Sequence, residues 1–383
     1  MDRSFLKALL YAAGAVVLAG AASAEDAVKI GVTQPLTGAF AADGNYVAQG
    51  AKLAAEAINK AGGVDGKQIE LVIEDNKSNP TEAAATAERL IVQDKVPVML
   101  GAWGSSLTLA VMPKLQEYKV PMVVETSSSG KITTSGNPYI FRISPTSEME
   151  AKAFAPLIKT MGIKKADFLA TNDDFGKGSM TEFTKMLKTN GVEIGASETM
   201  GEDATDLSAQ LAKIKASGGD TIFVTTDVKQ LTLILKQAKD QQVTARIITT
   251  GGSVSPDQLI EQAGDAANGS YHLVFFTPWF PDAVKNPEVA RAFMDAWKAA
   301  KYDVGGLTEG FRGWDGVYTI EAAIKDAGKA DAESIAKALW GVKVKGVNGD
   351  IAFIKQGPAG KESGQSVPSV YLVEIDGGKV VKQ

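Results

Sequence analysis

V-K-I-G-V-T at residues 28–33 opens a pattern that sets the class of fold. The segment is short, apolar and rich in β-branched residues, as expected of a buried strand. An alanine-rich helical pattern follows at 45–60 and ends at Gly62-Gly63, and an alternating strand pattern comes next at 68–74. Such strands, alternating with helices of about a dozen residues or more, are typical of βαβ units around a parallel sheet.

The alternation continues along the chain and starts again after residue 125. The remaining elements expected in the first part are helices at 80–94 and 108–118 and strands at 96–101 and 121–125. The second part shows helices at 147–161, 177–190, 207–217 and 230–241 and strands at 166–171, 193–199, 221–225, 246–250 and 270–276. Ser147 and Glu150 have capping-box spacing at the first of these helices. The sequence therefore predicts an α/β protein with two doubly wound, Rossmann-like lobes.

The last third is less regular. Its helices, at 287–300, 308–327 and 332–339, have no strands of their own, so we expect them to cover the first lobe, and short β segments follow at 342–344, 350–354 and 370–375. The prediction assigns residues 25–144 and 277–345 to lobe 1, and 145–276 and 346–383 to lobe 2. Three chain crossings between the lobes would form a hinge, which suits closure around a ligand.

The first 24 residues have the features of a secretory signal peptide. Arg3 and Lys7 are basic, 8–21 is an almost unbroken apolar run, and Ala22-Ser23-Ala24 is a small-x-small cleavage site. A membrane anchor would need ~20 apolar residues, but this run is shorter and meets Glu25-Asp26. We expect cleavage near Ala24 and a mature protein that is free in its compartment.

The composition narrows the possible functions. The chain has no cysteine, which excludes disulfides, thiolate metal sites, cysteine nucleophiles and a lipid-modified cysteine. Without a lipid anchor, an exported protein stays with its cell only where a second membrane retains it, so we expect the periplasm. The net charge is −5 with no long basic run, so we expect no nucleic-acid partner.

The candidate ligand site lies where strands end, because open α/β sheets bind ligands at the carboxyl ends of their strands. G-A-W-G-S-S at 101–106 and T-S-S-S-G at 126–130 follow two strands of the first lobe. They place Trp103, Ser105, Ser127 and Ser129 at that edge, where hydroxyls and backbone N–H groups could bind a carboxylate. Ordinary capping and turn chemistry is the alternative.

The second lobe contributes loops at 172–176, 226–228 and 250–253. Phe175 is either a lid over the ligand or a packed residue at a helix start. Asp227 either faces a ligand ammonium or caps the helix that begins beside it.

No enzymatic motif is found. The chain has no phosphate-binding G-x-x-x-x-G-K-[ST] loop, and its one histidine, His272, sits in a strand-like run. Neither a metal cluster nor a Ser-His-Asp triad can be assembled by sequence reasoning, so we predict no catalysis, metal or cofactor.

Several segments carry a family resemblance: I-G-V-T-Q-P-L-T-G at 30–38, G-G-V-D-G-K at 62–67 and L-A-K-I-K-A-S-G at 211–218. The chain resembles the Leu/Ile/Val (branched-chain amino acid) binding proteins of bacterial ABC importers over essentially the whole mature sequence. The resemblance implies a type I periplasmic-binding-protein fold, venus-flytrap closure, a monomer that delivers a small molecule to ABC permease subunits, and no enzymatic activity.

The resemblance also assigns roles to residues. Ser105, Ser127 and Ser129 match the positions that bind the substrate carboxylate in the family, and Phe175 matches an aromatic that closes the site. Asp227 and Gly251 match contact positions of the second lobe.

Three positions depart from the family pattern. Gly251 stands where an acid usually receives the ammonium, and Asp227 and Asp43 stand where aromatics are common. Either aspartate could take over the ammonium. We expect an amino acid of the branched-chain type or a related small carboxylate. An aromatic acid or amide, a sensor role beside a receptor kinase and, least favoured, a secreted hydrolase are the alternatives.

Overall fold

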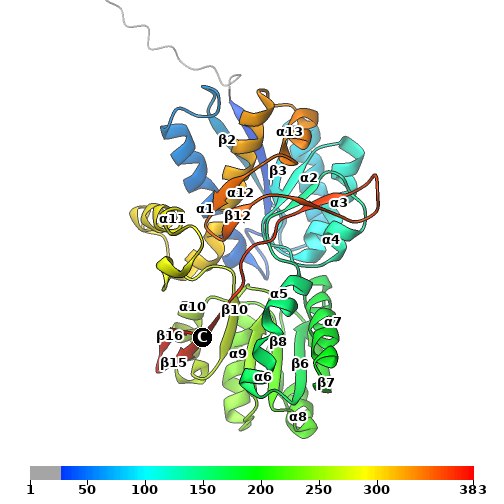
Figure 1. Cartoon of the computed structure of the whole chain (residues 1–383), viewed down its shortest axis with the longest axis vertical. Coiled ribbons are helices and arrows are strands. Elements are labelled where there is room, and N and C mark those ends of the chain that lie inside the picture. Colours follow the sequence, from blue (N-terminus) through cyan, green and yellow to red (C-terminus); the bar gives the residue numbers. More distant parts are fainter. Residues whose placement is uncertain (1–26) are drawn as a thin grey trace, which may run out of the picture.

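The structure, a computed structural model, describes residues 27–383. The expected signal peptide at 1–24, with its cleavage site near Ala24, lies outside the described residues. The described chain forms two α/β lobes stacked along the long axis of the molecule (Figure 1). Within residues 27–383, no helix is both long enough and apolar enough to cross a membrane.

Seven strands form the sheet of the first lobe, in the order β13-β14-β5-β4-β3-β1-β2. All neighbours in this sheet are parallel except β13, which runs antiparallel to β14 at the edge. The strands are Val28–Gln34 (β1), Ile69–Asp75 (β2), Met99–Gly101 (β3), Met122–Val124 (β4), Ile140–Arg142 (β5), Ile354–Gln356 (β13) and Ser363–Gln365 (β14). Strand β1, the stretch at which the sequence pattern opened, pairs with both β2 and β3 and is almost completely buried.

Helices cover both faces of this sheet. One apolar cluster joins the sheet to α1, α11, α12 and α13, and a second joins its other face to α2 and α3. These helices, with the short α4, are Ala41–Lys60 (α1), Pro80–Val92 (α2), Ser105–Tyr118 (α3), Lys131–Thr134 (α4), Pro287–Ala299 (α11), Leu307–Ala327 (α12) and Ala332–Leu339 (α13). The late helices α11, α12 and α13 thus pack on the first lobe. The backbones of α1 and α12 approach so closely at Gly50 that a Cβ there would overlap the carbonyl of Gly310.

The second lobe repeats the architecture with the order β16-β15-β10-β9-β8-β6-β7. Its strands are Lys165–Thr171 (β6), Glu193–Met200 (β7), Thr221–Thr225 (β8), Arg246–Thr250 (β9), Tyr271–Val274 (β10), Tyr371–Asp376 (β15) and Lys379–Lys382 (β16). Its helices are Ser147–Phe154 (α5), Leu157–Met161 (α6), Asp174–Thr189 (α7), Ser208–Ser217 (α8), Val228–Asp240 (α9) and Pro256–Ala263 (α10). One apolar cluster contains α5 and α7 and the other contains α8, α9 and α10. The predicted α/β class with two doubly wound lobes is thus confirmed.

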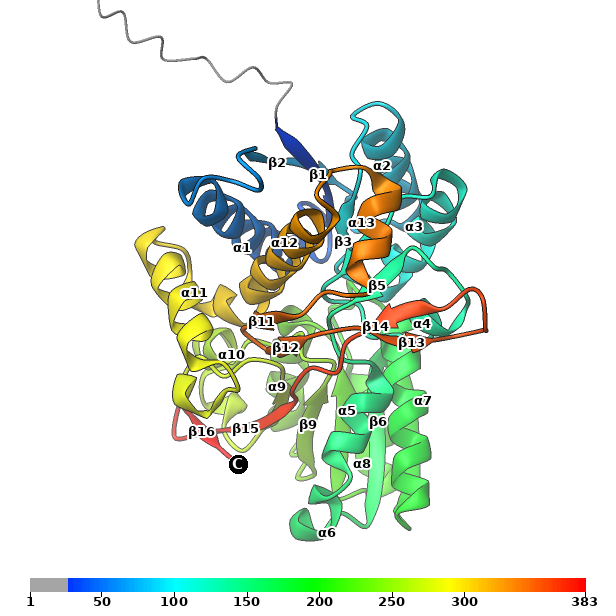
Figure 2. The same cartoon turned by 45° about the horizontal axis from the view of Figure 1, so that its top comes forward.

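The chain passes between the two sheets three times. The crossings are the segments between β5 and α5, between β10 and α11, and between β14 and β15. A two-stranded ribbon of Val344–Gly346 (β11) and Gly349–Ile351 (β12) precedes the last crossing. Figure 2 shows β11, β12 and β14 running across the middle of the molecule.

Two details differ from the sequence prediction. Residues 346–383 were assigned to the second lobe, but the β13–β14 hairpin joins the first sheet, because β14 pairs in parallel with β5. Only β15 and β16 lie in the second sheet. The expected capping box is also wrong: Thr146 caps α5 by accepting from the N–H of Met149, and Glu150 bonds elsewhere.

Candidate functional site

The serine-rich loops meet at the carboxyl edge of the first sheet, as predicted. Ser105 is the first residue of α3, and its Oγ accepts a hydrogen bond from the backbone N–H of Ser129 at 3.2 Å. The hydroxyl of Ser127 donates to the carbonyl of Ala102 at 2.8 Å. These bonds tie the loops after β3 and β4 to each other. The first N–H groups of α3 have no partner within their own helix, so this edge can donate hydrogen bonds to an anion.

A buried arginine that was not among the predicted site residues supports these loops. Arg142 ends β5, is fully buried, and donates from Nη1 to the carbonyls of Ser127 and Ser129 at 3.0 and 2.7 Å. Its Nε donates to Oε1 of Gln365 at 2.7 Å. Burial lowers the pKa of Arg142 to about 9, which still leaves the guanidinium charged at neutral pH. All of these partners are neutral, so the positive charge beneath the serine loops favours an anion above them.

The second lobe supplies the opposite wall. A small cavity between the lobes is lined by Trp103, Ser105 and Ser127 from the first lobe and by Phe175 and Gly251 from the second. Its free volume is about 10 Å³, which is no more than a single water needs. The lobes are therefore closed on each other, and entry of a larger ligand requires them to open.

The ring of Phe175 packs against Gly251. Phe175 lies in the first turn of α7, behind the capping residue Asp173. Gly251 follows β9 with φ of +89°, and a Cβ there would overlap the ring of Phe175. The backbone N–H of Gly251 donates to Oε2 of Glu150 at 2.6 Å. The aromatic ring thus occupies the space beside Gly251 into which a side chain at this position would extend.

A buried ion pair in α12 of the first lobe also contacts the second lobe. Arg312 and Glu309, one turn apart in α12, are 1 % and 2 % exposed and pair at 3.0 Å from Nε to Oε2. The indole N–H of Trp103 donates to the same Oε2 at 3.0 Å. Arg312 also donates from Nη2 to the carbonyl of Gly252 in the second lobe at 2.6 Å. This pair was not predicted, because nothing near residue 309 in the sequence marks it as lying under Trp103.

The two aspartates of the predicted site do not line the cavity. Asp43 lies in the first turn of α1 and Asp227 caps α9 from the other lobe, each almost fully buried. Burial raises the pKa of Asp43 well above its ordinary value, and the charges of Glu309 and Asp227 raise it further. Burial likewise raises the pKa of Asp227. One oxygen of Asp227 caps α9, as in the second interpretation of this residue, because Oδ1 accepts a hydrogen bond from the N–H of Gln230 at 2.8 Å.

Ser129 lines a separate groove at the entrance of the cleft. It contributes to a groove of about 370 Å³ between the lobes, lined also by Lys131 and Asp174. Asp174 bonds across the lobe boundary, to the Lys131 ammonium at 2.8 Å and to the Ser106 hydroxyl at 3.1 Å. These contacts hold the lobes together at the cleft entrance.

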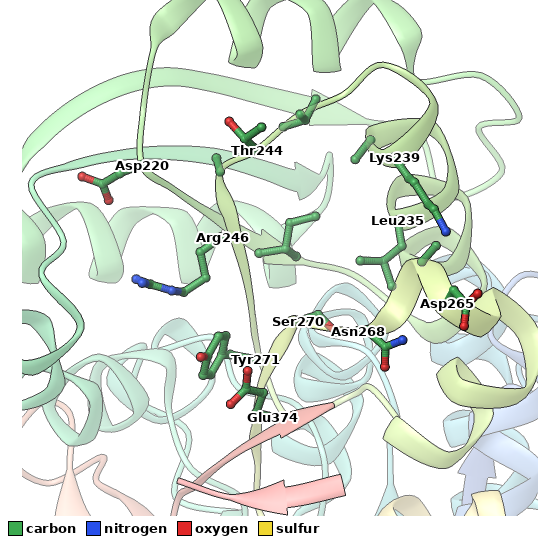
Figure 3. A pocket seen from close by; sticks show the side chains of 16 residues that line it. Asp220, Leu235, Lys239, Thr244, Arg246, Asp265, Asn268, Ser270, Tyr271 and Glu374 are labelled. Atoms are coloured by element: carbon green, nitrogen blue, oxygen red, sulfur yellow. The ribbon is translucent and has the colours of Figure 1, made fainter. Parts of the chain in front are cut away.

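A larger cavity lies far from this cleft. Its volume is about 610 Å³, and Asp220, Arg246 and Tyr271 are among its lining residues (Figure 3). These residues lie at the amino ends of β8, β9 and β10, at the opposite edge of the sheet from Gly251. Ligands in open α/β sheets bind at the carboxyl ends, and this cavity mixes Arg246 and Lys239 with acids such as Asp265. We therefore place the candidate site in the cleft.

The described residues offer no metal centre, since no group of three His, Asp or Glu among residues 27–383 is placed to hold an ion. His272 is completely buried between Thr249 and Ser270, with ring nitrogens 2.9 and 2.8 Å from their hydroxyls. Burial lowers the pKa of His272 to about 3, so it stays neutral. The ring of His272 thus bonds to these two hydroxyls and to none of the cleft serines.

Comparison with known proteins gives the family. The chain matches the model of a family described as "Periplasmic binding protein" over residues 27–379. The chain belongs to this family. The resemblance noted in the sequence is thereby confirmed.

The similarity to other periplasmic binding proteins extends over nearly the full length of both chains. The leucine-, isoleucine-, valine-, threonine- and alanine-binding protein of Pseudomonas aeruginosa is 30% identical, covering 90% of this chain and 91% of that one. The isoleucine complex of a branched-chain amino acid transporter substrate binding protein from Streptococcus pneumoniae has a TM-score of 0.80 at 29% identity, covering 93% and 100%. A solute binding protein of an ABC transporter from Rhodopseudomonas palustris, in complex with 3,4-dihydroxybenzoic acid, has a TM-score of 0.79 at 28% identity, covering 93% and 96%.

Proposed function

We propose that this periplasmic binding protein is the substrate-binding subunit of an ABC importer and captures an amino acid or a related small carboxylate. The observation that carries the proposal is the pair of serine-rich loops tied together above Arg142 and facing Phe175 and Gly251 across the cleft. Neutral donors over a buried positive charge suit a carboxylate. Relatives named for branched-chain amino acids support the ligand class.

The protein would work by a hinge equilibrium and carry out no reaction. Ligand in the cleft contacts both lobes, so it binds the closed form better than the open form and shifts the population toward closure. The closed form would then dock on the permease subunits in the membrane. We infer a monomer that acts in the periplasm after its signal peptide is removed near Ala24. A periplasmic sensor partner would use the same closure and differs only in what the closed form contacts.

A second ligand class is favoured by one observation. Gly251 has no side chain to offer an ammonium, and the ring of Phe175 packs beside it. An aromatic acid such as a hydroxybenzoate keeps the carboxylate contacts and would stack on an aromatic lid. The relative bound to 3,4-dihydroxybenzoic acid shows that this fold accepts such ligands.

A thermal-shift screen of amino acids against aromatic and hydroxy acids tests the proposal. A ligand at 100 times its Kd should add about 2.7 kcal/mol of stability. Ser105→Ala should weaken binding at least about tenfold, or ~1.4 kcal/mol. Ser208→Ala, at the exposed start of α8, is the matched control and should bind normally. Equal binding by both variants would refute the site, and shifts with aromatic acids alone would replace the amino acid by the second class.

A further inference from the structure

One buried glutamine links the serine-rich loops to the hinge. Gln365 ends β14, is completely buried, and lies beside Arg142 of β5 in the register of these two parallel strands (Figure 2). Strand β14 comes from the C-terminal part of the chain, and the last crossing between the lobes begins directly after it. The side chain of Gln365 is therefore placed where the support of the candidate site and the hinge come together.

The amide of Gln365 uses its full hydrogen-bonding capacity. Its Oε1 accepts from Nε of Arg142 at 2.7 Å and from the hydroxyl of Thr133 at 3.3 Å. Its Nε2 donates to the carbonyl of Ser144 at 2.9 Å and to the carbonyl of Ser366 at 2.7 Å. A carboxamide offers two donor hydrogens and two acceptor lone pairs, so all four have a partner. Neither a carboxylate nor a hydrocarbon of the same size can make these four bonds.

The neutrality of Gln365 leaves the charge of Arg142 without a counter-charge. Arg142 donates to Gln365 and, from Nη2, to the hydroxyl of Thr133 at 2.7 Å. Its other bonds go to the carbonyls of Ser127 and Ser129. Arginines are almost never fully buried unless an acid pairs with them, yet the neighbour at position 365 is an uncharged amide. The electric field of the guanidinium therefore extends to the loops above it and favours an anion there.

The donor half of the same amide holds two segments of the hinge. Ser144 lies in the crossing between β5 and α5, and Ser366 lies in the crossing between β14 and β15. The backbone N–H of Ser366 also donates to the carbonyl of Arg142 at 2.8 Å. Both crossings are thus fixed to the first lobe as far as these two serines. In these crossings, rotation of the lobes must take place beyond them, within residues 145–146 and 367–370.

We propose that Gln365 is a positioning residue with two linked effects: it holds Arg142 without neutralising it, so that the cleft selects an anion, and it fixes the point at which two of the three crossings begin to bend. The inference rests on the proposed function, because it assumes that the serine loops hold the ligand carboxylate. A side chain with only a structural role would affect stability but not the choice between an acid and its neutral amide. That choice is therefore the central measurement.

Two substitutions of similar size separate the effects. In Gln365→Glu, a carboxylate pairs with Nε of Arg142, and its charge opposes the attraction of the guanidinium for a ligand anion. In Gln365→Met, Arg142 keeps its other acceptors and its charge, so selection of an anion should remain. Both variants lose the donor to Ser144 and Ser366. Gln68→Glu is the matched control, because Gln68 is exposed just before β2 in the same lobe and the substitution adds the same charge.

The probes are pairs of an acid and its amide: L-leucine with L-leucinamide, benzoate with benzamide, and propionate with propionamide. Calorimetry measures their binding to the wild-type protein and to the three variants. The measurements are made at about pH 6.5, because an α-amino group titrates at ~7.7–8.0 and both leucine probes then keep their ammonium. Hydrogen exchange followed by mass spectrometry reports the mobility of residues 143–147 and 366–370.

We expect the wild-type protein to prefer at least one acid over its amide by about tenfold or more. Gln365→Glu should lose most of that preference, whereas Gln365→Met and Gln68→Glu should keep it. Exchange in the two crossing segments should be faster by about tenfold or more in both Gln365 variants, because two hydrogen bonds are lost, and unchanged in Gln68→Glu. Gln365→Glu reports both effects by itself, so the test does not depend on the folding of Gln365→Met.

The outcomes separate the inference from the proposed function. If Gln365→Glu selects the acid as strongly as the wild type does, if Gln365→Met loses the preference as completely, or if exchange in the crossings is unchanged, the inference is wrong while the carboxylate cleft stands. If the wild-type protein binds none of the probes, or binds the amides as tightly as the acids, the proposed function itself is contradicted.

Discussion

Replacing Gly251 by alanine tests how the lid and the second-lobe wall fit together. Gly251 has φ of +89°, a conformation that side-chain-bearing residues rarely adopt, and a Cβ would overlap Cζ of Phe175. Gly269 is a matched control, because it has φ of +79° in the same lobe and a Cβ there would meet nothing within 4 Å. The two substitutions therefore share the backbone strain and differ in the contact with the ring.

The expected costs follow from these two contributions. Positive φ costs an alanine roughly 1–2 kcal/mol at either position. Displacing the Phe175 ring from its rotamer adds about 0.5–1.5 kcal/mol at position 251 alone. Because the ring lines the same cavity as Ser105 and Ser127, its displacement should also weaken ligand binding by about tenfold or more.

Urea unfolding gives the stability of each variant, and calorimetry with the best ligand of the screen gives its affinity. Gly269→Ala should lose stability but bind normally, whereas Gly251→Ala should lose more stability and also affinity. Phe175→Leu should couple to Gly251→Ala by more than about 0.5 kcal/mol. Equal losses at both glycines with unchanged affinity would refute the assignment of Phe175 as the lid.

Three further predictions concern polar side chains. Arg142→Met leaves the carbonyls of the serine loops without donors, so unfolding free energy should fall by about 2 kcal/mol or more and carboxylate affinity should fall with it; an unchanged urea midpoint would contradict this. Burial raises the pKa of Glu125 and of Glu150 from 4.5 to about 7. Unfolding therefore releases their protons between those pH values, and stability should decrease as pH rises from about 4.5 to 7, by up to about 3 kcal/mol per group. The double variant Glu125→Gln, Glu150→Gln should show a flatter profile in urea unfolding, and an unaltered slope would exclude these groups as its source. Tyr46→Phe removes the hydroxyl that accepts from Nε2 of Gln258 at 2.8 Å across the lobes, so scattering should show a larger open fraction at unchanged fold; no change would show that this bond does not hold the lobes closed.

The local pattern of apolar residues in the sequence was sufficient to predict most of the helices and strands. Strand β1 and helix α1 could be predicted because each carries its own signal, an apolar β-branched run and an amphipathic period. The helix begins at Ala41, four residues before the predicted start. The β13–β14 hairpin could not be assigned to the first lobe, because its two three-residue strands are polar and β14 pairs with a strand more than 200 residues away.

The candidate site likewise has parts that could be predicted from local sequence and parts that could not. The serine loops and Phe175 could be placed at the cleft because, in each of the two sheets, the carboxyl ends of the parallel strands share an edge. The supports of the site were not found, because they depend on distant segments. Arg142 is held by Gln365, more than 200 residues away, and Glu309 reaches Trp103 from α12. A single arginine at the end of an apolar strand was the only signal for Arg142, and it does not identify a partner.

The placement of the last strands has a consequence for how the protein acquires its structure. Residues 354–365 complete the first sheet and residues 371–382 complete the second. Both lobes therefore depend on segments made at the end of synthesis, and neither corresponds to a continuous stretch of the gene. A chain stopped near residue 345 would expose β5 and β10 as bare sheet edges, which favour aggregation. Early folding would have to remain incomplete in both lobes until the whole chain is present.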